Sequence, residues 1–253
     1  MARQSGIIKL KGTIGGISFF KSADGYMARE KGGVDGKRIA SDPAFKRTRE
    51  NGQEFGRAGK AGKLLRNALR TLLQNARDAR MVGRLTKALL AIIKTDTVHA
   101  RGSRTVESGN MNGLIGFDFN ISGKLETTLY ATHEKSVDRT TGELSLTLAP
   151  FNPLERIAAP AGSTHFKISG GGVELDFEQG TFNFAAADSG ILPLTSTATS
   201  ALDLGVTLTA ETTLPILQVM SIEFYQEVNG EMYALNNGAY NAMSILQVDQ
   251  SGS

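Results

Sequence analysis

The chain of 253 residues contains no cysteine and no tryptophan. Without cysteine it has no disulfide, no thiolate nucleophile and no cysteine-ligated zinc or iron–sulfur site. It also lacks any run of 18 apolar residues, so we expect no membrane-spanning helix. The apolar start at Ile7, Ile8 and Leu10 is interrupted by lysines and lacks the hydrophobic region of a signal peptide. We therefore expect synthesis in the cytoplasm, while release as an extracellular assembly or particle, by lysis or through another signal, stays open.

Acidic residues are scarce in the first part of the chain and basic residues are scarce in the rest. Residues 1–104 contain 23 Lys and Arg against 8 Asp and Glu, whereas residues 105–253 contain 5 against 17. The two parts therefore have net charges of +15 and −12. This split favours nucleic-acid binding by the basic part or head-to-tail attraction between copies, although two differently charged solvated surfaces would give the same numbers.

Residues 1–40 predict a glycine-rich β-hairpin arm followed by a hinge. Ile7–Ile14 and Ile17–Lys21 are the expected hairpin strands, with a tight turn at Gly15-Gly16. The glycines of residues 31–40 favour a flexible linker. Such a hairpin needs a packing partner, which is either this chain's own C-terminal domain or the sheet edge of a neighbouring copy. The predicted residues of this self-assembly arm are Ile7, Ile8, Leu10, Ile14, Ile17, Phe19, Phe20 and Tyr26.

Residues 41–104 predict a basic α-helical hairpin. Asp42 or its neighbour Ser41 can cap a helix that begins near Pro43. Apolar residues then recur at helical spacing over 58–76 and over 81–93, with basic residues around each apolar face. The glycines at 52, 56, 59 and 62 each lower helix propensity by about 1 kcal/mol, and we expect them to admit another backbone closely. The predicted basic interface or nucleic-acid face comprises Arg47, Arg49, Lys60, Lys63, Arg66, Arg70, Arg77, Arg80 and Arg84.

Residues 105–253 predict an acidic domain made of strands alone. Short runs rich in β-branched and aromatic residues alternate with turn signals, such as Ser169-Gly170-Gly171-Gly172 and Val228-Asn229-Gly230-Glu231. About eight to ten strands at this spacing favour an antiparallel β-sandwich of the immunoglobulin-like (Ig-like) kind. The predicted fold class is therefore α+β, with the arm at 1–40, the helical hairpin at 41–104 and the sandwich at 105–253.

The sequence contains no pattern typical of catalysis or of a bound metal or cofactor. His99, His133 and His165 lack metal-ligand spacing and stand beside no recognisable nucleophile. The stretch from Gly59 to Lys63 superficially matches a phosphate-binding loop, but the required first glycine and the final hydroxyl residue are missing. We therefore expect no enzyme activity, no cofactor and no metal.

The segment from Gly12 to Arg66 carries several short patterns that occur together in a known family. They are Gly12-Thr13-Ile14-Gly15-Gly16-Ile17, Tyr26, Arg29, Asp42-Pro43-Ala44-Phe45 and Arg47-Thr48-Arg49-Glu50-Asn51. The segment resembles the start of uncharacterised proteins found across Bacteroidota, which have a glycine-rich β start, a basic helical part and a β-rich end. This resemblance implies that the N-terminal pattern is a unit and suggests a bacterial or phage-like source. It implies no activity.

The favoured hypothesis is a structural protein that assembles with copies of itself as a filament, tube or virion-like component. Exchange of the N-terminal arm and head-to-tail charge complementarity would join the copies. The alternative is nucleic-acid binding by the basic helical hairpin, whose charges suit phosphate contacts although no aromatic residues are interleaved to stack on bases. A ligand-binding or carbohydrate-binding β-sandwich is the third hypothesis.

Overall fold

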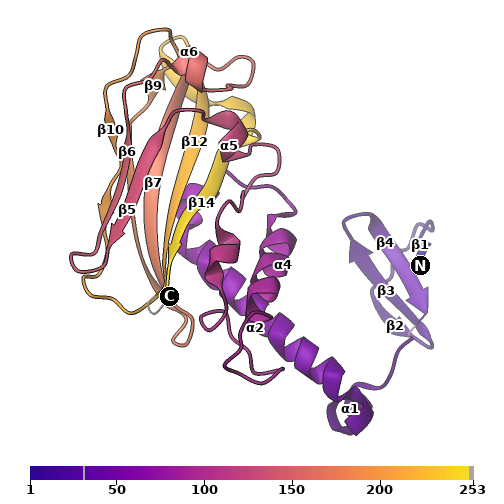
Figure 1. Cartoon of the computed structure of the whole chain (residues 1–253). Coiled ribbons are helices and arrows are strands. Elements are labelled where there is room, and N and C mark those ends of the chain that lie inside the picture. Colours follow the sequence, from indigo (N-terminus) through magenta and orange to yellow (C-terminus); the bar gives the residue numbers. More distant parts are fainter. Residues whose placement is uncertain (31, 251–253) are drawn as a thin grey trace. The chain divides into compact units, whose positions relative to one another are not determined.

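The computed structural model describes residues 1–30 and 32–250 and shows a mixed α+β chain (Figure 1). Its internal contacts divide the chain into two compact units, Met1–Arg49 and Glu50–Ser253. The predicted boundaries at residues 40 and 104 group the chain differently, because here most of the helical region belongs to the same unit as the C-terminal strands. Lys31 of the predicted linker and residues 251–253 lie outside the described residues.

The first unit contains a four-stranded antiparallel sheet in the order β1-β4-β3-β2. The prediction of one strand over Ile7–Ile14 was wrong for residues 7–11, which lie in the connection between β1 and β2. The reason is a side chain: the Gln4 amide donates to the Leu10 carbonyl at 3.2 Å and accepts from the Leu10 N–H at 2.8 Å. It thereby takes both backbone groups that a strand partner would take. The strands are β1 (Ala2–Arg3), β2 (Gly12–Ile14), β3 (Ile17–Ser22) and β4 (Gly25–Glu30).

The predicted flexible linker contains a short helix, α1 (Gly36–Ser41), so the expectation was wrong there. Asp35 caps this helix by accepting a hydrogen bond from the Lys37 N–H at 3.1 Å, which offsets the low helix propensity of the glycine. The next turn, η1 (Pro43–Phe45), begins as predicted, because the Asp42 carboxylate accepts from the Ala44 N–H at 2.9 Å.

The long helix α2 (Lys46–Ala68) continues through its glycines without a break. Gly52, Gly56 and Gly59 face open space, so the expected close approach of another backbone was wrong for these three positions. Gly62 does lie against another helix, since a Cβ there would come within 3.3 Å of Leu89 Cδ1. The other helices and turns of this unit are α3 (Arg70–Leu73), α4 (Met81–Ile93), η2 (Met111–Leu114), α5 (Leu125–Thr128), α6 (Pro153–Arg156) and η3 (Leu235–Gly238).

A six-stranded antiparallel sheet, here called the large sheet, forms the middle of the second unit. Its central strands are β7 (His165–Asp176) and β12 (Ile216–Val228), and its other strands are β8 (Thr181–Asp188), β9 (Leu192–Pro193), β13 (Glu231–Ala234) and β14 (Ala242–Asp249). The predicted hairpin at Asn229-Gly230 is confirmed: Val228 pairs with Glu231, and both turn residues have positive φ angles.

A second, smaller antiparallel sheet lies over one face of the large sheet. Its strands are β5 (His133–Asp138), β6 (Glu143–Leu148), β10 (Leu202–Asp203) and β11 (Val206–Thr207). The prediction of a turn at residues 169–172 was wrong, because these residues form the middle of β7. Glycine is needed there for close packing: a Cβ at Gly170 would lie 2.7 Å from the Leu204 carbonyl oxygen, and one at Gly172 would lie 2.6 Å from Leu144 Cδ2.

Both faces of the large sheet are therefore covered by apolar side chains. Toward the smaller sheet, Phe166 of β7 and Met220 of β12 pack with residues such as Leu146. On the opposite face, residues such as Val173 and Val219 pack with buried residues of α2 and α4. Figure 1 shows these two helices beside the large sheet. The α+β class and the antiparallel C-terminal sheets are thus as predicted, and the helices α2 and α4 form a third layer on these sheets. The expectation of strands alone over 105–253 was wrong, because this range also contains the short helices η2, α5, α6 and η3.

Candidate functional site

The N-terminal sheet gathers part of the predicted self-assembly arm on one face. The register of β2, β3 and β4 places Ile14, Ile17, Phe19 and Tyr26 on the same side. Ile14 is 62% exposed and Ile17 is 46% exposed, while the two aromatic residues are half-buried. Lys21 and Glu30 share this side of the sheet, and we call the four other residues its apolar face.

The other four predicted arm residues lie elsewhere. Phe20 is on the opposite side of the sheet, where the guanidinium carbon of Arg29 lies 5.5 Å from the centre of its ring. Ile7 and Ile8 are exposed in the segment between β1 and β2, and Leu10 is bound there by Gln4. The structure therefore divides the predicted arm into an apolar face, a residue behind it and an exposed loop.

None of the described residues among 1–49 is buried. A small sheet gains its stability by covering one apolar face, and strands without such cover are at best marginally stable in water. The edge of this sheet is also incomplete: β2 pairs with β3 only from Ile17 to Phe19, so β3 extends beyond its neighbour. An apolar face and an extended edge are the two features that recruit another chain to a sheet.

Arg84 and Arg49, both predicted for the basic face, are used inside the protein. Arg84 donates hydrogen bonds to the carbonyls of Asp118 at 2.6 Å and Phe119 at 3.2 Å, and it forms an ion pair with Asp78. Arg49 donates to two carbonyls that precede it in the chain, at 2.7 and 2.9 Å. These two arginines hold backbone segments together and are not available as an open basic surface.

Three other basic residues come together around one hollow. Arg66, Arg70 and Arg77 line a cavity of 300 Å³, which we call the arginine hollow. Within the described part of the chain none of the three forms an ion pair, and the hollow has no acidic residue in its lining. The Nη1 atom of Arg66 is buried and has no hydrogen-bond acceptor.

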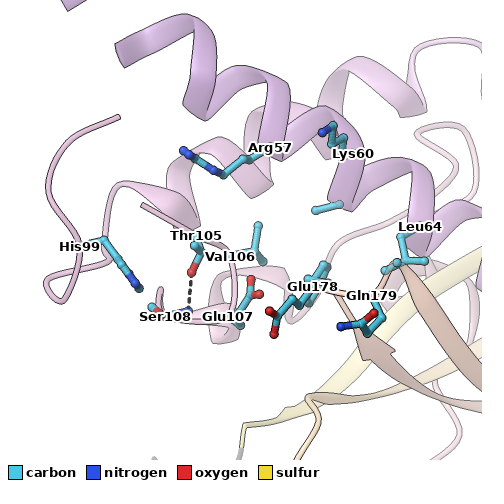
Figure 2. Close-up of a pocket in the computed structure, with 13 residues that line it drawn as sticks. Arg57, Lys60, Leu64, His99, Thr105, Val106, Glu107, Ser108, Glu178 and Gln179 are labelled. Carbon is cyan, nitrogen blue, oxygen red and sulfur yellow. Dashed lines mark hydrogen bonds between the residues drawn. The ribbon is translucent and has the colours of Figure 1, made fainter. Parts of the chain in front are cut away.

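The remaining basic residues do not join this hollow. Arg47, Lys63 and Arg80 are exposed. Lys60 lines a different hollow of 660 Å³, in which Arg57 and Lys60 of α2 lie across from Glu107 and Glu178 (Figure 2). The nine predicted residues therefore do not form one basic face. The arginine hollow has three of them and no acidic residue in its lining, whereas the hollow of Figure 2 has both basic and acidic residues.

Sequence reasoning missed a buried carboxylate beside the hollow of Figure 2. Asp96 accepts hydrogen bonds from the N–H groups of Val98, His99 and Thr105 at 2.8 to 3.0 Å, and its Oδ2 lies 2.8 Å from His99 Nδ1. Burial raises the pKa of Asp96, but these hydrogen bonds outweigh burial and lower it from 3.8 to about 2. Asp96 therefore organises the loop after α4, with three backbone N–H groups and the His99 ring as its hydrogen-bond partners.

A second missed carboxylate joins this loop to α2. Glu54 is almost fully buried and accepts from the Arg104 guanidinium at 2.7 and 3.1 Å and from the Gly102 N–H at 2.8 Å. A third buried carboxylate, Glu174, also has a structural role, since it accepts from the Thr209 hydroxyl at 2.7 Å. In the residues that the structure describes, no group of three His, Asp or Glu side chains is arranged to hold a metal ion.

The helices of the described residues include none that is both long and apolar enough to cross a membrane. No protein-family model, no curated protein and no solved structure matches this chain. The functional proposal therefore rests on the geometry of the N-terminal sheet and of the arginine hollow.

Proposed function

We propose that this chain is a structural protein that assembles with copies of itself, as a filament, tube or virion-like component. The observation that carries the proposal is the N-terminal sheet, in which no described residue is buried although four apolar side chains share a face. Ordering the backbone costs about 1–2 kcal/mol per residue, and a sheet recovers this cost mainly by burying apolar surface. A second chain that covers the apolar face would supply that burial.

Another copy suits this role because the chain offers both an extended sheet edge and opposite charges. Strand β3 continues past β2, so a neighbouring chain can add a strand beside Phe20 and the residues that follow it. The opposite net charges of the two parts favour head-to-tail contacts. Ion pairs inside the protein, such as Arg104–Glu54 and Arg139–Asp249, make the surface imbalance smaller than the residue count. Charge therefore serves to orient the copies more than to hold them together.

The finer description of the C-terminal sheets as an Ig-like sandwich is also a proposal. Its support is the core shared by the smaller sheet and one face of the large sheet. In this view the sandwich is the rigid body of each copy, and the helices attach it to the N-terminal unit by chain continuity. The resemblance to Bacteroidota proteins, with a bacterial or phage-like source, stays a hypothesis.

The assembly proposal is tested by charge substitutions on the two sides of the N-terminal sheet. Ile17→Asp places a carboxylate on the apolar face, whereas Thr13→Asp places one on the opposite side, where the residue is already exposed. Sedimentation velocity and negative-stain microscopy should show assemblies of the native chain and of Thr13→Asp, but monomers of Ile17→Asp. Equal assembly of all three chains would refute a role for this face.

Deletion of residues 1–36 gives a second test of the same proposal. Residues 50–253 keep their own core, so the shortened chain should remain folded and soluble as a monomer. Light scattering that shows unchanged assembly would eliminate the N-terminal unit as the connector.

Nucleic-acid binding is the second candidate function, and the arginine hollow is the observation that favours it. Phosphate contacts need only well-placed positive charges, and they weaken steeply as salt rises. Gel-shift experiments should show binding at low salt that is lost in the double variant Arg66→Ala and Arg70→Ala. Absence of any shift with the native chain at low salt would remove this candidate.

A further inference from the structure

The arginine hollow is held in place by the core beneath it. Arg66 and Arg70 are four residues apart, so a helical path brings them to one side. Arg77 follows after α3 ends at Leu73 and lines the same hollow. Helical hydrogen bonds continue from α2 into α3. The Leu69 N–H donates to the Leu65 carbonyl at 3.0 Å, and the Leu73 N–H donates to the Leu69 carbonyl at 2.9 Å. The leucines are buried, so the arginines project from a fixed backbone.

The acidic residues near the hollow are engaged elsewhere. Asp78, the next residue after Arg77, accepts from the N–H groups of Arg80 and Ile121 and pairs with Arg84. Glu223 accepts from Asn75 at 3.0 Å and from the Tyr225 hydroxyl at 2.7 Å. Three like charges therefore share one hollow without a compensating anion from these neighbours. Like charges at this spacing repel, and an anion between them reverses the sign of the interaction.

The donors of the hollow suit an anion with several oxygens. A guanidinium group offers a planar fork of N–H donors, and three forks exceed what the two oxygens of a carboxylate can accept. The Nη1 of Arg66 lacks an acceptor inside the protein. The amides of Asn67 and Gln74, which also line the hollow, add neutral donors. The cavity volume of 300 Å³ lies at the lower end of the range for ligand pockets, about 300 to 1,000 Å³, and suits a small ion.

We propose that the arginine hollow binds an oxyanion of the phosphate class through Arg66, Arg70 and Arg77. The same chemistry is presented by free phosphate and by a phosphate group of a nucleic-acid backbone. The site is separate from the N-terminal sheet that carries the assembly proposal, because all of its lining residues belong to Glu50–Ser253.

The test is isothermal titration calorimetry of the full chain with inorganic phosphate at low salt. Arg70→Ala removes an exposed arginine that lines the hollow, and Arg80→Ala removes an exposed arginine outside it. Loss of one charged donor from three should weaken phosphate binding by about tenfold or more, whereas Arg80→Ala should bind as the native chain does. Arg70→Lys, which keeps the charge without the fork, should bind with intermediate strength.

Circular dichroism of each variant establishes whether it is folded. If Arg70→Ala is not folded, Arg77→Ala replaces it as the test variant. Phosphate that fails to bind the native chain, or that binds the native chain and folded Arg70→Ala equally, would overturn the proposal. The titration is repeated with Ile17→Asp, the variant designed not to assemble. Undiminished binding there supports the site whether or not the assembly proposal survives, and binding only in assembled protein contradicts a site within one copy.

A competition experiment then distinguishes the two sources of phosphate. The probe is a short single-stranded oligonucleotide. If it binds the native chain, is displaced by phosphate and does not bind Arg70→Ala, it occupies the hollow through its phosphate backbone. Phosphate binding with no oligonucleotide binding supports a site for the free ion.

Discussion

In residues 50–253 the large sheet is covered on both faces, whereas none of the described residues of 1–49 is buried at all. The second unit uses its apolar side chains on itself, and even its carboxylates at positions 54 and 96 are held by internal donors. The first unit also has strands, a tight turn and aromatic residues, but it does not form a buried core of its own. The second unit therefore has a core of its own, and the proposal that the first unit is a contact element rests on this difference.

The largest expected difference concerns one aromatic residue in each unit. Phe166 is fully buried between the two sheets, so Phe166→Ala should lower the free energy of unfolding of the second unit by about 4 kcal/mol. Phe19→Ala, at a half-buried position on the apolar face, should lower the free energy of unfolding measured in the same way by less than about 0.5 kcal/mol. Urea denaturation of dilute protein, followed by circular dichroism, measures both. Similar losses in the two variants would erase the distinction between the units.

A slightly smaller effect is expected for the buried ion pair. Glu54→Ala leaves the Arg104 guanidinium, largely shielded from solvent, and the Gly102 N–H without their acceptor. The expected destabilisation is about 3 kcal/mol by urea denaturation. Glu107→Ala, which removes an exposed carboxylate from the same region, is the matched control and should change stability by less than about 0.5 kcal/mol. Comparable losses from both substitutions would show that the Glu54–Arg104 pair has no special role.

The third prediction uses pH. The pKa of Asp96 is lowered to about 2 in the folded protein, so its carboxylate stabilises the fold fully above the ordinary value of 3.8 and loses that effect as pH falls from there toward 2. Asp96→Asn should therefore cost about 2 kcal/mol at pH 7, and the gap between variant and native chain should narrow between pH 4 and pH 2. A gap that stays constant through this window, in urea denaturation at each pH, would contradict the assignment.

The smallest effect is expected to be stabilising. Gly52 faces open space on α2, so Gly52→Ala should raise the free energy of unfolding by about 0.5 to 1 kcal/mol through helix propensity. Gly170→Ala is the opposite case, because its Cβ would clash with the Leu204 carbonyl, and it should lower stability. Thermal denaturation shows the sign of each change, and the same sign for both would mean that the two glycine environments are not as different as the structure indicates.

Local chemistry made parts of this fold predictable. The cap at Asp42 and the hairpin at Asn229-Gly230 depend on residues within a few positions, and both were found from sequence. The centre of β7 was not found, because its glycines have the sequence signature of a turn. Gly170 is required there by close packing against Leu204, which lies far along the chain. The helix at Gly36–Ser41 was missed because the glycines outweighed the cap at Asp35.

The candidate sites show the same limit. Helical spacing predicted basic residues around each apolar face, and the structure brings three of them, Arg66, Arg70 and Arg77, to one hollow while Lys63 lies outside it. Spacing gave no means of telling these residues from Arg84, whose acceptors are carbonyls more than thirty positions away. Whether a basic residue stays at the surface or forms internal hydrogen bonds depends on partners that lie far away in the sequence.

Hydrogen exchange of the full chain at a series of concentrations tests the central claim most directly. Backbone amides of β7 and β12 should be protected at every concentration, because both faces of their sheet are covered within one chain. Amides of β3 and β4 should exchange quickly in dilute monomers and become protected as assemblies form. Strong protection of β3 and β4 in monomers, equal to that of β7 and β12, would contradict the account.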